Sequence, residues 1–309
     1  MELNLEGVHV LVTGASGGIG LATANLFYVK RHVDHDAIVT AHYHSNPDSL
    51  KEFTPLNNSR SQIIQADLRK EADVQRLFKE AEVTFGSVQI LIINHGVSDP
   101  KDEYIWEMSL ERWKNTIETN LTSSFLVARE YLKRLKNASA NLREDASIVL
   151  IGSTAGKYGE AGHADYAASK SAMMYGLTMT LKNEIVKIAP KGRVNCIGPG
   201  WVKTAMAEES LKNPKTLYAA LATTPLKKIA EPDDIATQVV LLSSNVISGH
   251  VSGQVLMIEG GMEGRLQNQP EDVGLDLAQT QTSSSSKSKK KKKKGGNGAK
   301  KPTPELDLD

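Results

Sequence analysis

The chain lacks the features that mark several specialised classes of protein. It has one cysteine, Cys196, which excludes a disulfide within the chain and a cysteine-ligated metal cluster. No run approaches the ~18 apolar residues that a membrane-spanning helix needs, and the first residues lack the basic and apolar regions of a signal peptide. Only 5% of the residues are aromatic, and the net charge is +1. We therefore expect a globular protein of the cytoplasm, with no metal site and no membrane segment.

The near-neutral total hides an uneven distribution of charge. Residues 265–309 hold ten Lys or Arg and six Asp or Glu, which leaves 27 basic and 30 acidic residues before them. A run from Lys287 to Lys294 repels itself and offers almost nothing apolar to bury. We therefore expect one domain over 1–264 and a disordered, Lys-rich tail over 265–309. The tail is either simply solvated or binds a polyanion or a nuclear import receptor, which would add the nucleus as an alternative location.

Short apolar runs alternate with amphipathic stretches along the first 264 residues. The runs are rich in Val and Ile without strict alternation, which is typical of parallel strands covered on both faces, and they lie at 8–12, 37–41, 62–66, 88–93, 147–151, 193–197 and 254–258. Helical patterns lie at 19–31, 71–85, 110–137, 165–189 and 233–244. This order predicts an α/β fold, a single doubly wound, Rossmann-like domain with a mainly parallel, seven-stranded sheet. Ligands of such sheets bind outside the carboxyl ends of the strands.

The first expected strand runs directly into a glycine-rich turn, Thr13-Gly14-Ala15-Ser16-Gly17-Gly18-Ile19-Gly20. Gly14 suits the sharp turn off the strand, Gly18 the close approach of a phosphate, and Gly20 the packing of helix on strand. The helix that follows offers free N–H groups and the positive end of its dipole. The turn therefore predicts a binding site for the pyrophosphate of a dinucleotide, with the candidate residues Gly14, Ser16, Gly18, Ile19 and Gly20.

Two further motifs lie near the middle of the chain. Tyr166 and Lys170 are four residues apart, so on a helix they lie on one face. Ser153 comes just beyond the expected strand 147–151, where a doubly wound sheet places its chemistry. Together with the glycine-rich turn, Ser153 and the Tyr-x-x-x-Lys pattern resemble the short-chain dehydrogenase/reductase family. The resemblance covers roughly residues 5–262.

The resemblance implies a reaction and a role for each residue. Reduction of a carbonyl needs a hydride at carbon and a proton at oxygen, but the pKa of tyrosine is ordinarily about 10. An ammonium stabilises a phenolate, so Lys170 and an oxidised nicotinamide are expected to lower the pKa of Tyr166. Tyr166 would act as general acid in reduction and general base in oxidation, and Ser153 would hydrogen-bond the substrate oxygen. Lys170 would also hold the nicotinamide ribose, and Asn120 would position a water that relays protons to Lys170.

The same resemblance implies further contacts with a nicotinamide dinucleotide. Asp67, with Leu68 beside it, resembles the family's aspartate that hydrogen-bonds the adenine. The segment Ile93-Asn94-His95-Gly96 stands where the family usually has Asn-Asn-Ala-Gly, so Asn94 and Gly96 match while the other two positions depart. After the sixth strand a Pro-Gly turn would cross the nicotinamide and meet its carboxamide, with the candidate residues Pro199, Gly200, Val202 and Thr204.

The choice between the two nicotinamide cofactors depends on the end of the second strand. An acidic residue there would bind the ribose 2′-hydroxyl and repel a 2′-phosphate. The segment 40–46 has no Asp or Glu, while His44 and Ser45 offer hydrogen bonds to a phosphate. We therefore expect NADP(H), with NAD(H) as the alternative, since Gly17 stands where many NADP-using relatives carry Arg.

The substrate is a small carbonyl or alcohol compound whose identity stays open. The candidate pocket residues are mixed in polarity, and residues 205–228 are expected to form a lid. Oxoacyl thioesters, sugars, polyols, steroids and xenobiotic ketones all fit such a pocket, whose candidate residues are Ser98, Tyr158, His163, Trp201 and Met206, while Ala205, Met206, Leu211, Tyr218 and Leu221 are the candidate apolar residues of the lid.

A carbonyl reductase or alcohol dehydrogenase is the main functional hypothesis. A 3-oxoacyl-thioester reductase of lipid or polyketide metabolism is the second hypothesis. A nicotinamide-binding regulator with a polyanion-binding tail is the non-enzyme alternative, although the presence of all four catalytic residues argues against it. The family resemblance also implies a homotetramer or homodimer that packs through the stretches 110–137 and 165–189.

Overall fold

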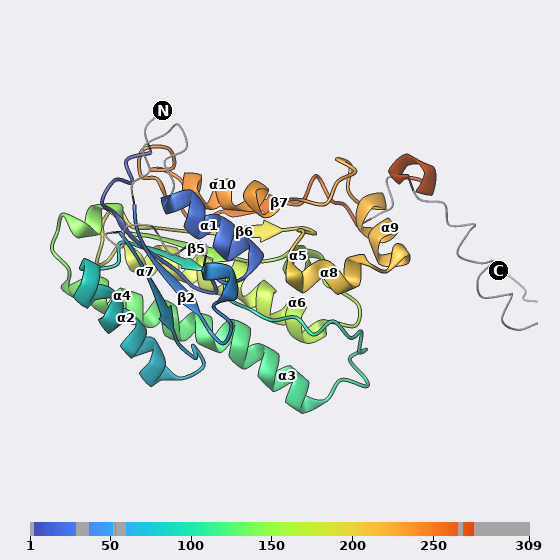
Figure 1. The fold of residues 1–309 in the computed structure, drawn as a ribbon, viewed down its shortest axis with the longest axis horizontal. Coiled ribbons are helices and arrows are strands. Elements are labelled where there is room, and N and C mark those ends of the chain that lie inside the picture. Colours follow the sequence, from blue (N-terminus) through green and yellow to red (C-terminus); the bar gives the residue numbers. More distant parts are fainter. Residues whose placement is uncertain (1–2, 29–36, 52, 54–59, 265–267, 275–309) are drawn as a thin grey trace, which may run out of the picture.

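Seven parallel strands form one sheet in the computed structural model, which describes residues 3–28, 37–51, 53, 60–264 and 268–274 (Figure 1). Their order across the sheet is β3-β2-β1-β4-β5-β6-β7, so the chain builds outward from β1 to one edge and then returns to build toward the other. This confirms the predicted doubly wound α/β fold and its seven strands. The strands are β1 (His9–Val12), β2 (Ile38–Tyr43), β3 (Ser61–Gln65), β4 (Ile90–Ile93), β5 (Ser147–Ile151), β6 (Arg193–Pro199) and β7 (Val255–Ile258).

Helices cover both faces of the sheet. On one face α1 (Gly18–Tyr28) packs beside α10 (Pro232–Ser243), and on the other lie α2 (Glu71–Phe85), α4 (Ser123–Asn137) and α7 (Thr178–Ile185) (Figure 1). Neighbouring strand residues serve opposite cores, which explains why these strands show no alternation of apolar and polar residues. The remaining helices are α3 (Leu110–Ile117), α5 (Thr154–Tyr158), α6 (Ala164–Ser171), α8 (Ala205–Leu211) and α9 (Pro214–Ala222), with short 3₁₀ turns η1 (Asp48–Leu50), η3 (Leu142–Asp145) and η5 (Pro270–Val273).

Two helices that the sequence predicts as continuous contain π-helical turns. The stretch 110–137 is α3, the π turn η2 (Glu118–Thr122) and α4, and the stretch 165–189 contains α6, the π turn η4 (Ala172–Leu177) and α7. A π turn inserts one residue into the helix and changes the direction of the side chains on it. Asn120 lies on the first of these turns, so the irregularity sets the direction of a predicted catalytic side chain.

The described C-terminal segment 268–274 packs onto α9. Asn268 is buried, its amide donates to Leu221 O (2.6 Å) and Thr224 O (2.9 Å), and its backbone N–H donates to Ala222 O (2.9 Å). Ordered packing thus continues beyond Gly264. The division into a domain at 1–264 and a tail at 265–309 stays a prediction, and the lysine-rich run from Lys287 to Lys294 lies outside the described residues.

Neither a metal cluster nor a membrane span is found in the described ranges. None of the helices there is long and apolar enough to cross a membrane. Among the same residues, no group of three or more His, Cys, Asp or Glu side chains is arranged to hold a metal ion.

Candidate active site

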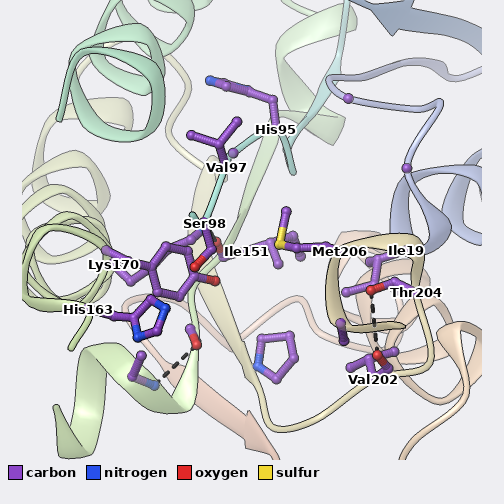
Figure 2. Close-up of a pocket in the computed structure, with 18 of the residues that line it drawn as sticks. Ile19, His95, Val97, Ser98, Ile151, His163, Lys170, Val202, Thr204 and Met206 are labelled. Carbon is purple, nitrogen blue, oxygen red and sulfur yellow. Dashed lines mark hydrogen bonds between the residues drawn. The ribbon is translucent and has the colours of Figure 1, made fainter. Parts of the chain in front are cut away.

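A large cavity opens at the carboxyl ends of the strands. Its volume is about 1130 Å³, enough for a dinucleotide and a small second molecule. It lies where the strand order reverses between β1 and β4, which is the expected ligand site of a doubly wound sheet. Figure 2 shows Ile19, Val202 and Thr204 on one side of this cavity and Lys170 and His163 on the other.

The glycine-rich turn is shaped by contacts that a side chain would block. Gly14 has a φ of +62°, and a Cβ there would lie 2.8 Å from the Cα of His95. A Cβ on Gly18 would lie 2.8 Å from Cγ2 of Thr204, so this glycine lets the turn approach the segment after β6. A Cβ on Gly20 would overlap Gly14 O. The absence of side chains thus creates both the turn and the close packing around it.

Two side chains, Asn94 and His42, brace this turn. Asn94 Nδ2 donates to Thr13 O (3.1 Å) and Gly14 O (3.0 Å). His42 Nδ1 accepts from the Gly14 N–H (3.0 Å), while its Nε2 donates to the Ala66 carbonyl (3.0 Å). Burial lowers the pKa of His42 to about 4, so the ring is neutral and keeps its acceptor near neutral pH. His42 is therefore a buried part of the turn's support.

His95, one of the two departures from the family pattern, is also accommodated by hydrogen bonds. Its Nδ1 lies 2.9 Å from Thr13 Oγ1 and its Nε2 lies 2.7 Å from Ser123 Oγ. Burial holds the pKa of His95 well below its usual value. Ile93, the other departure, is fully buried in the core. The structure thus gives both residues well-packed positions at the end of β4.

The far end of the cavity contains an arginine that sequence reasoning missed. Arg69 donates from Nε to Asp67 Oδ1 (2.9 Å) and from Nη2 to Asp67 Oδ2 (2.9 Å). These hydrogen bonds hold the pKa of the Asp67 carboxyl well below its usual range. His44 Nε2 lies 3.9 Å from the same carboxylate, and both His44 and Arg69 line the cavity. The signal that could have found Arg69 is its spacing, two residues after Asp67 in the segment that follows β3.

Ser153, Tyr166 and Lys170 meet at the end of β5. Ser153 caps α5 by accepting from the Ala155 N–H (3.1 Å) and also hydrogen-bonds Tyr166. Tyr166 and Lys170 lie on α6, with Lys170 Nζ 5.8 Å from the centre of the tyrosine ring. Lys170 Nζ donates to Ile151 O (2.8 Å), which ties the helix to the last residue of the strand. All three side chains line the cavity.

The pKa values of these groups follow from their burial. Desolvation raises the pKa of Tyr166 to about 12, and its hydrogen bond with Ser153 acts in the opposite direction. Desolvation also lowers the pKa of Lys170 to about 8. Burial thus dominates among the protein's own groups, and the expected lowering of the Tyr166 pKa by Lys170 together with an oxidised nicotinamide stays a prediction. A tyrosine with a raised pKa keeps its proton and can donate it.

Asn120 lies behind the cavity rather than in its lining. It is fully buried, accepts from the Val97 N–H at Oδ1 (2.8 Å), and donates from Nδ2 to Val97 O (2.9 Å) and Ser169 Oγ (3.1 Å). A Cβ on Gly96 would lie 3.3 Å from Asn120 Oδ1 and 3.4 Å from Lys170 Nζ. The side chain therefore joins the segment after β4 to the helix that carries Tyr166 and Lys170.

Asp165, a second residue that sequence reasoning missed, fixes the start of α6. Asp165 is buried, and its Oδ2 accepts from Thr116 Oγ1 (2.6 Å) and Arg112 Nε (3.3 Å). Arg112 also donates to Gly162 O (3.2 Å) and Lys101 O (2.8 Å). Because Asp165 adjoins Tyr166 in the chain, this network positions the tyrosine relative to two loops beside the cavity.

Most of the candidate residues are brought together. All five candidate substrate-pocket residues line the cavity, and from the lid only Ala205 and Met206 of the five apolar candidates do so. Gly20, Ser45 and Asn120 are the predicted site residues that do not line it. The others do: Gly14, Ser16, Gly18, Ile19, His44, Asp67, Leu68, Asn94, Gly96, Ser153, Tyr166, Lys170, Pro199, Gly200, Val202 and Thr204.

Comparisons with known proteins agree with this arrangement. A family model described as enoyl-(acyl carrier protein) reductase matches residues 14–263. The chain is 31% identical to the 3-oxoacyl-[acyl-carrier-protein] reductase FabG of Vibrio cholerae, over 84% of this chain and 99% of that protein. The Escherichia coli protein of the same name is 28% identical over 84% of this chain and 99% of its own length. A crystal structure from Brucella melitensis, titled short-chain dehydrogenase/reductase SDR:glucose/ribitol dehydrogenase, matches 86% of this chain and 100% of that one, with 30% identity and a TM-score of 0.74.

Proposed function

Because the chain belongs to the short-chain dehydrogenase/reductase family, we propose that it is an NADP(H)-preferring enzyme that interconverts a carbonyl compound and a secondary alcohol. Its broader class, an NAD(P)-dependent oxidoreductase acting on CH–OH or C=O groups, follows from the family. The observation that carries the proposal is the meeting of Ser153, Tyr166 and Lys170 in one cavity with the glycine-rich turn.

The residues present fit a nicotinamide dinucleotide. The turn leaves its backbone open because Gly14 and Gly18 have no side chains, and it leads into the N-terminus of α1, which favours a pyrophosphate. Val202 and Thr204 lie across the cavity near Ile19, where a carboxamide would meet them (Figure 2). Bound there, the nicotinamide would supply or accept the hydride at carbon.

The protein's own side chains handle the proton and the oxygen. The Tyr166 hydroxyl, protonated at neutral pH, donates its proton to the carbonyl oxygen in reduction and regains it in oxidation. Ser153 hydrogen-bonds the same oxygen, since its hydroxyl already lies within reach of Tyr166. Lys170, held at Nζ by Ile151 O, places positive charge beside the phenolate as the proton leaves. Asn120 holds the backbone of Val97 and thus this side of the cavity.

The proposed preference for NADP(H) rests on Arg69 and His44. Both line the end of the cavity where β2 and β3 finish, and Asp67, the nearby carboxylate, is already held by Arg69. A guanidinium binds a phosphate strongly because it forms charge-assisted, paired hydrogen bonds. Ser45, which was also predicted to bind this phosphate, is exposed and does not line the cavity.

A 3-oxoacyl-thioester reductase remains the second candidate. The identities to the two FabG proteins favour it, although 31% identity over a family of many activities does not fix a substrate. A nicotinamide-binding regulator remains the non-enzyme alternative. Its distinguishing property would be tight binding of the cofactor without turnover of any carbonyl or alcohol.

Three further proposals concern the whole chain. A homodimer or homotetramer is supported by apolar side chains exposed on the long helices, namely Leu110, Phe125 and Tyr175. The molar mass of the protein, measured by light scattering, tests this proposal. Binding of a polyanion or an import receptor through the run Lys287 to Lys294 stays a prediction from sequence, as does the cytoplasmic location.

The test of the function is Tyr166→Phe, assayed by NADPH absorbance with a panel of ketones and secondary alcohols. Removal of the hydroxyl takes away the proton donor, so kcat is expected to fall about 10²- to 10⁴-fold while the affinity for NADPH changes little. Tyr104→Phe is the matched control, because this tyrosine is exposed and does not line the cavity. Undiminished turnover by the Tyr166→Phe enzyme would overturn the mechanism.

A further inference from the structure

The wall of the cavity beyond Tyr166 consists of two loops that are fixed to each other. One spans 98–102 after β4 and the other spans 158–163 around the end of α5. The Glu103 N–H donates to Gly162 O (3.0 Å), and Arg112 Nη2 donates to the same carbonyl (3.2 Å). Arg112 Nη1 also holds Lys101 O (2.8 Å). The wall is therefore preformed, and its side chains face the cavity in a defined arrangement.

This wall carries negative charge. Asp99, Asp102 and Glu160 all line it. The cations beside it are paired with other carboxylates: Arg112 lies 3.3 Å from Asp165 and 3.4 Å from Glu103, and Lys101 lies 3.8 Å from Glu103. Because like charges repel, a carboxylate or phosphate on a substrate is disfavoured at this wall.

His163 adds a ring nitrogen that lacks a partner. Its Nε2 lies 2.9 Å from Asp99 O, and since a carbonyl oxygen only accepts, Nε2 carries a proton. Its Nδ1 is buried and has no hydrogen-bond partner within the described part of the chain. Asp102 Oδ1 lies 3.6 Å from Nδ1, beyond hydrogen-bond distance. A hydroxyl group between these two atoms would donate to the carboxylate oxygen and pair with Nδ1.

We propose that Asp102 and His163 Nδ1 together bind a hydroxyl group of the substrate, which donates to the Asp102 carboxylate and pairs with Nδ1, so that the substrate is a neutral hydroxy ketone or polyol. His163 adjoins the N-terminus of α6, three residues before Tyr166, so the bound hydroxyl lies close to the reacting carbon. Figure 2 shows His163 and Ser98 at the Lys170 end of the cavity, away from Val202 and Thr204. The inference rests on the proposed function, because it takes the carbonyl to react at Tyr166.

Asp102→Asn tests this inference directly. The Asp102 side chain is 82% exposed, so its replacement leaves the core intact. The new amide no longer offers a charged acceptor to the hydroxyl group of the substrate. The matched control is Glu107→Gln. It removes the same charge from the same segment between β4 and α3, at an exposed position outside the cavity lining.

The measurement is kcat/KM of the full chain with NADPH on three matched ketones: 2-butanone, 1-hydroxy-2-butanone and 2-oxobutanoate. The unmodified enzyme is expected to prefer the hydroxy ketone to both others. Asp102→Asn is expected to lower the ratio of hydroxy ketone to plain ketone about tenfold or more, mainly through KM, since it removes a charge-assisted hydrogen bond. Glu107→Gln is expected to leave that ratio unchanged.

The outcomes separate this inference from the function on which it rests. An unchanged ratio in Asp102→Asn, or a preference of the unmodified enzyme for 2-oxobutanoate, would overturn the inference and leave the carbonyl reductase intact. If none of the three ketones nor an acetoacetyl thioester is reduced with NADPH or NADH, the proposed function fails and the inference fails with it.

Discussion

At the scale of single residues, Asp67 shows how a contact with a neighbour changes the meaning of a motif. The family resemblance implies that this carboxylate hydrogen-bonds the adenine of the cofactor. In the structure, however, Arg69 donates to both of its oxygens. At this place the cavity is lined by the Asp67–Arg69 ion pair, in which the two charges compensate each other and guanidinium N–H groups lie at the edge. Such an edge suits a 2′-phosphate better than a carboxylate alone would.

Replacement of Arg69 by Ala is expected to reverse the cofactor preference. The change removes the guanidinium and frees the Asp67 carboxylate, which then repels a 2′-phosphate and can accept from a ribose hydroxyl. We expect KM for NADPH to rise about 10- to 100-fold and KM for NADH to change little. Arg76→Ala, a loss of the same charge on α2 outside the cavity lining, serves as the control. Equal effects on both cofactors would argue against a phosphate site at Arg69.

The sequence identified the residues that carry chemistry more readily than those that support them. Tyr166, Lys170 and Ser153 could be predicted because their spacing along one helix and one strand end determines where they lie. His42 could not be assigned correctly, because its contact with Gly14 arises only when strands from separate parts of the chain come together. Arg69 was missed although its partner Asp67 is only two residues away, because the direction of both side chains into the cavity is a property of the fold. The rise in the pKa of Tyr166 could not be predicted for the same reason, since its burial is a property of the fold.

At the scale of helices and strands, the π turns mark the limit of periodicity arguments. An amphipathic pattern over 110–137 predicts a helix, and one inserted residue hardly disturbs that pattern. The insertion at 118–122 nevertheless decides that Asn120 points to Val97 and Ser169. Strand positions were easier to predict, because buried parallel strands are continuous apolar runs.

The packing of α9 leads to a prediction at the same scale. Asn268→Ala would leave the carbonyls of Leu221 and Thr224 without their side-chain donor in a buried place, at a cost of about 1–3 kcal/mol. We expect faster hydrogen exchange in α9 and a Tm lower by roughly 2–4 °C for each kcal/mol lost. Asn183→Ala removes an exposed amide that bonds Met179 O on α7 and should change stability by no more than about 0.5 kcal/mol. If the two variants behave alike, Asn268 does not hold the helix end.

At the scale of the whole molecule, buried histidines make the stability of the fold depend on pH. His9 and His42 are each 1% exposed, and burial lowers the pKa of both to about 4. In the unfolded chain each would bind a proton near pH 6.5, whereas the folded protein resists protonation until about pH 4. Their contribution to stability is therefore complete above pH 6.5 and is lost as the pH falls toward 4, on the order of 3 kcal/mol for each histidine.

Thermal unfolding between pH 7 and pH 4.5 tests this coupling. We expect Tm to fall steadily across that window, and we expect His9→Gln to flatten the fall even if it lowers Tm at pH 7. His250→Gln is the control, because this histidine is exposed. If Tm falls with pH equally in His9→Gln and in the unmodified protein, protonation of the buried His9 does not cause the loss of stability in acid.

The predicted lid has a consequence for how this enzyme can diverge or be engineered. In this segment α8 supplies Ala205 and Met206 to the cavity and α9 supplies Thr216, while the reacting groups come from the end of β5 and from α6. Exchange of the lid sequence can thus retune selectivity as a separable module, without disturbing the chemistry. The C-terminal end of α9 is anchored to the rest of the protein, because its carbonyls must still accept from Asn268. Length and end geometry, more than side-chain identity, therefore define which replacement lids this scaffold accepts.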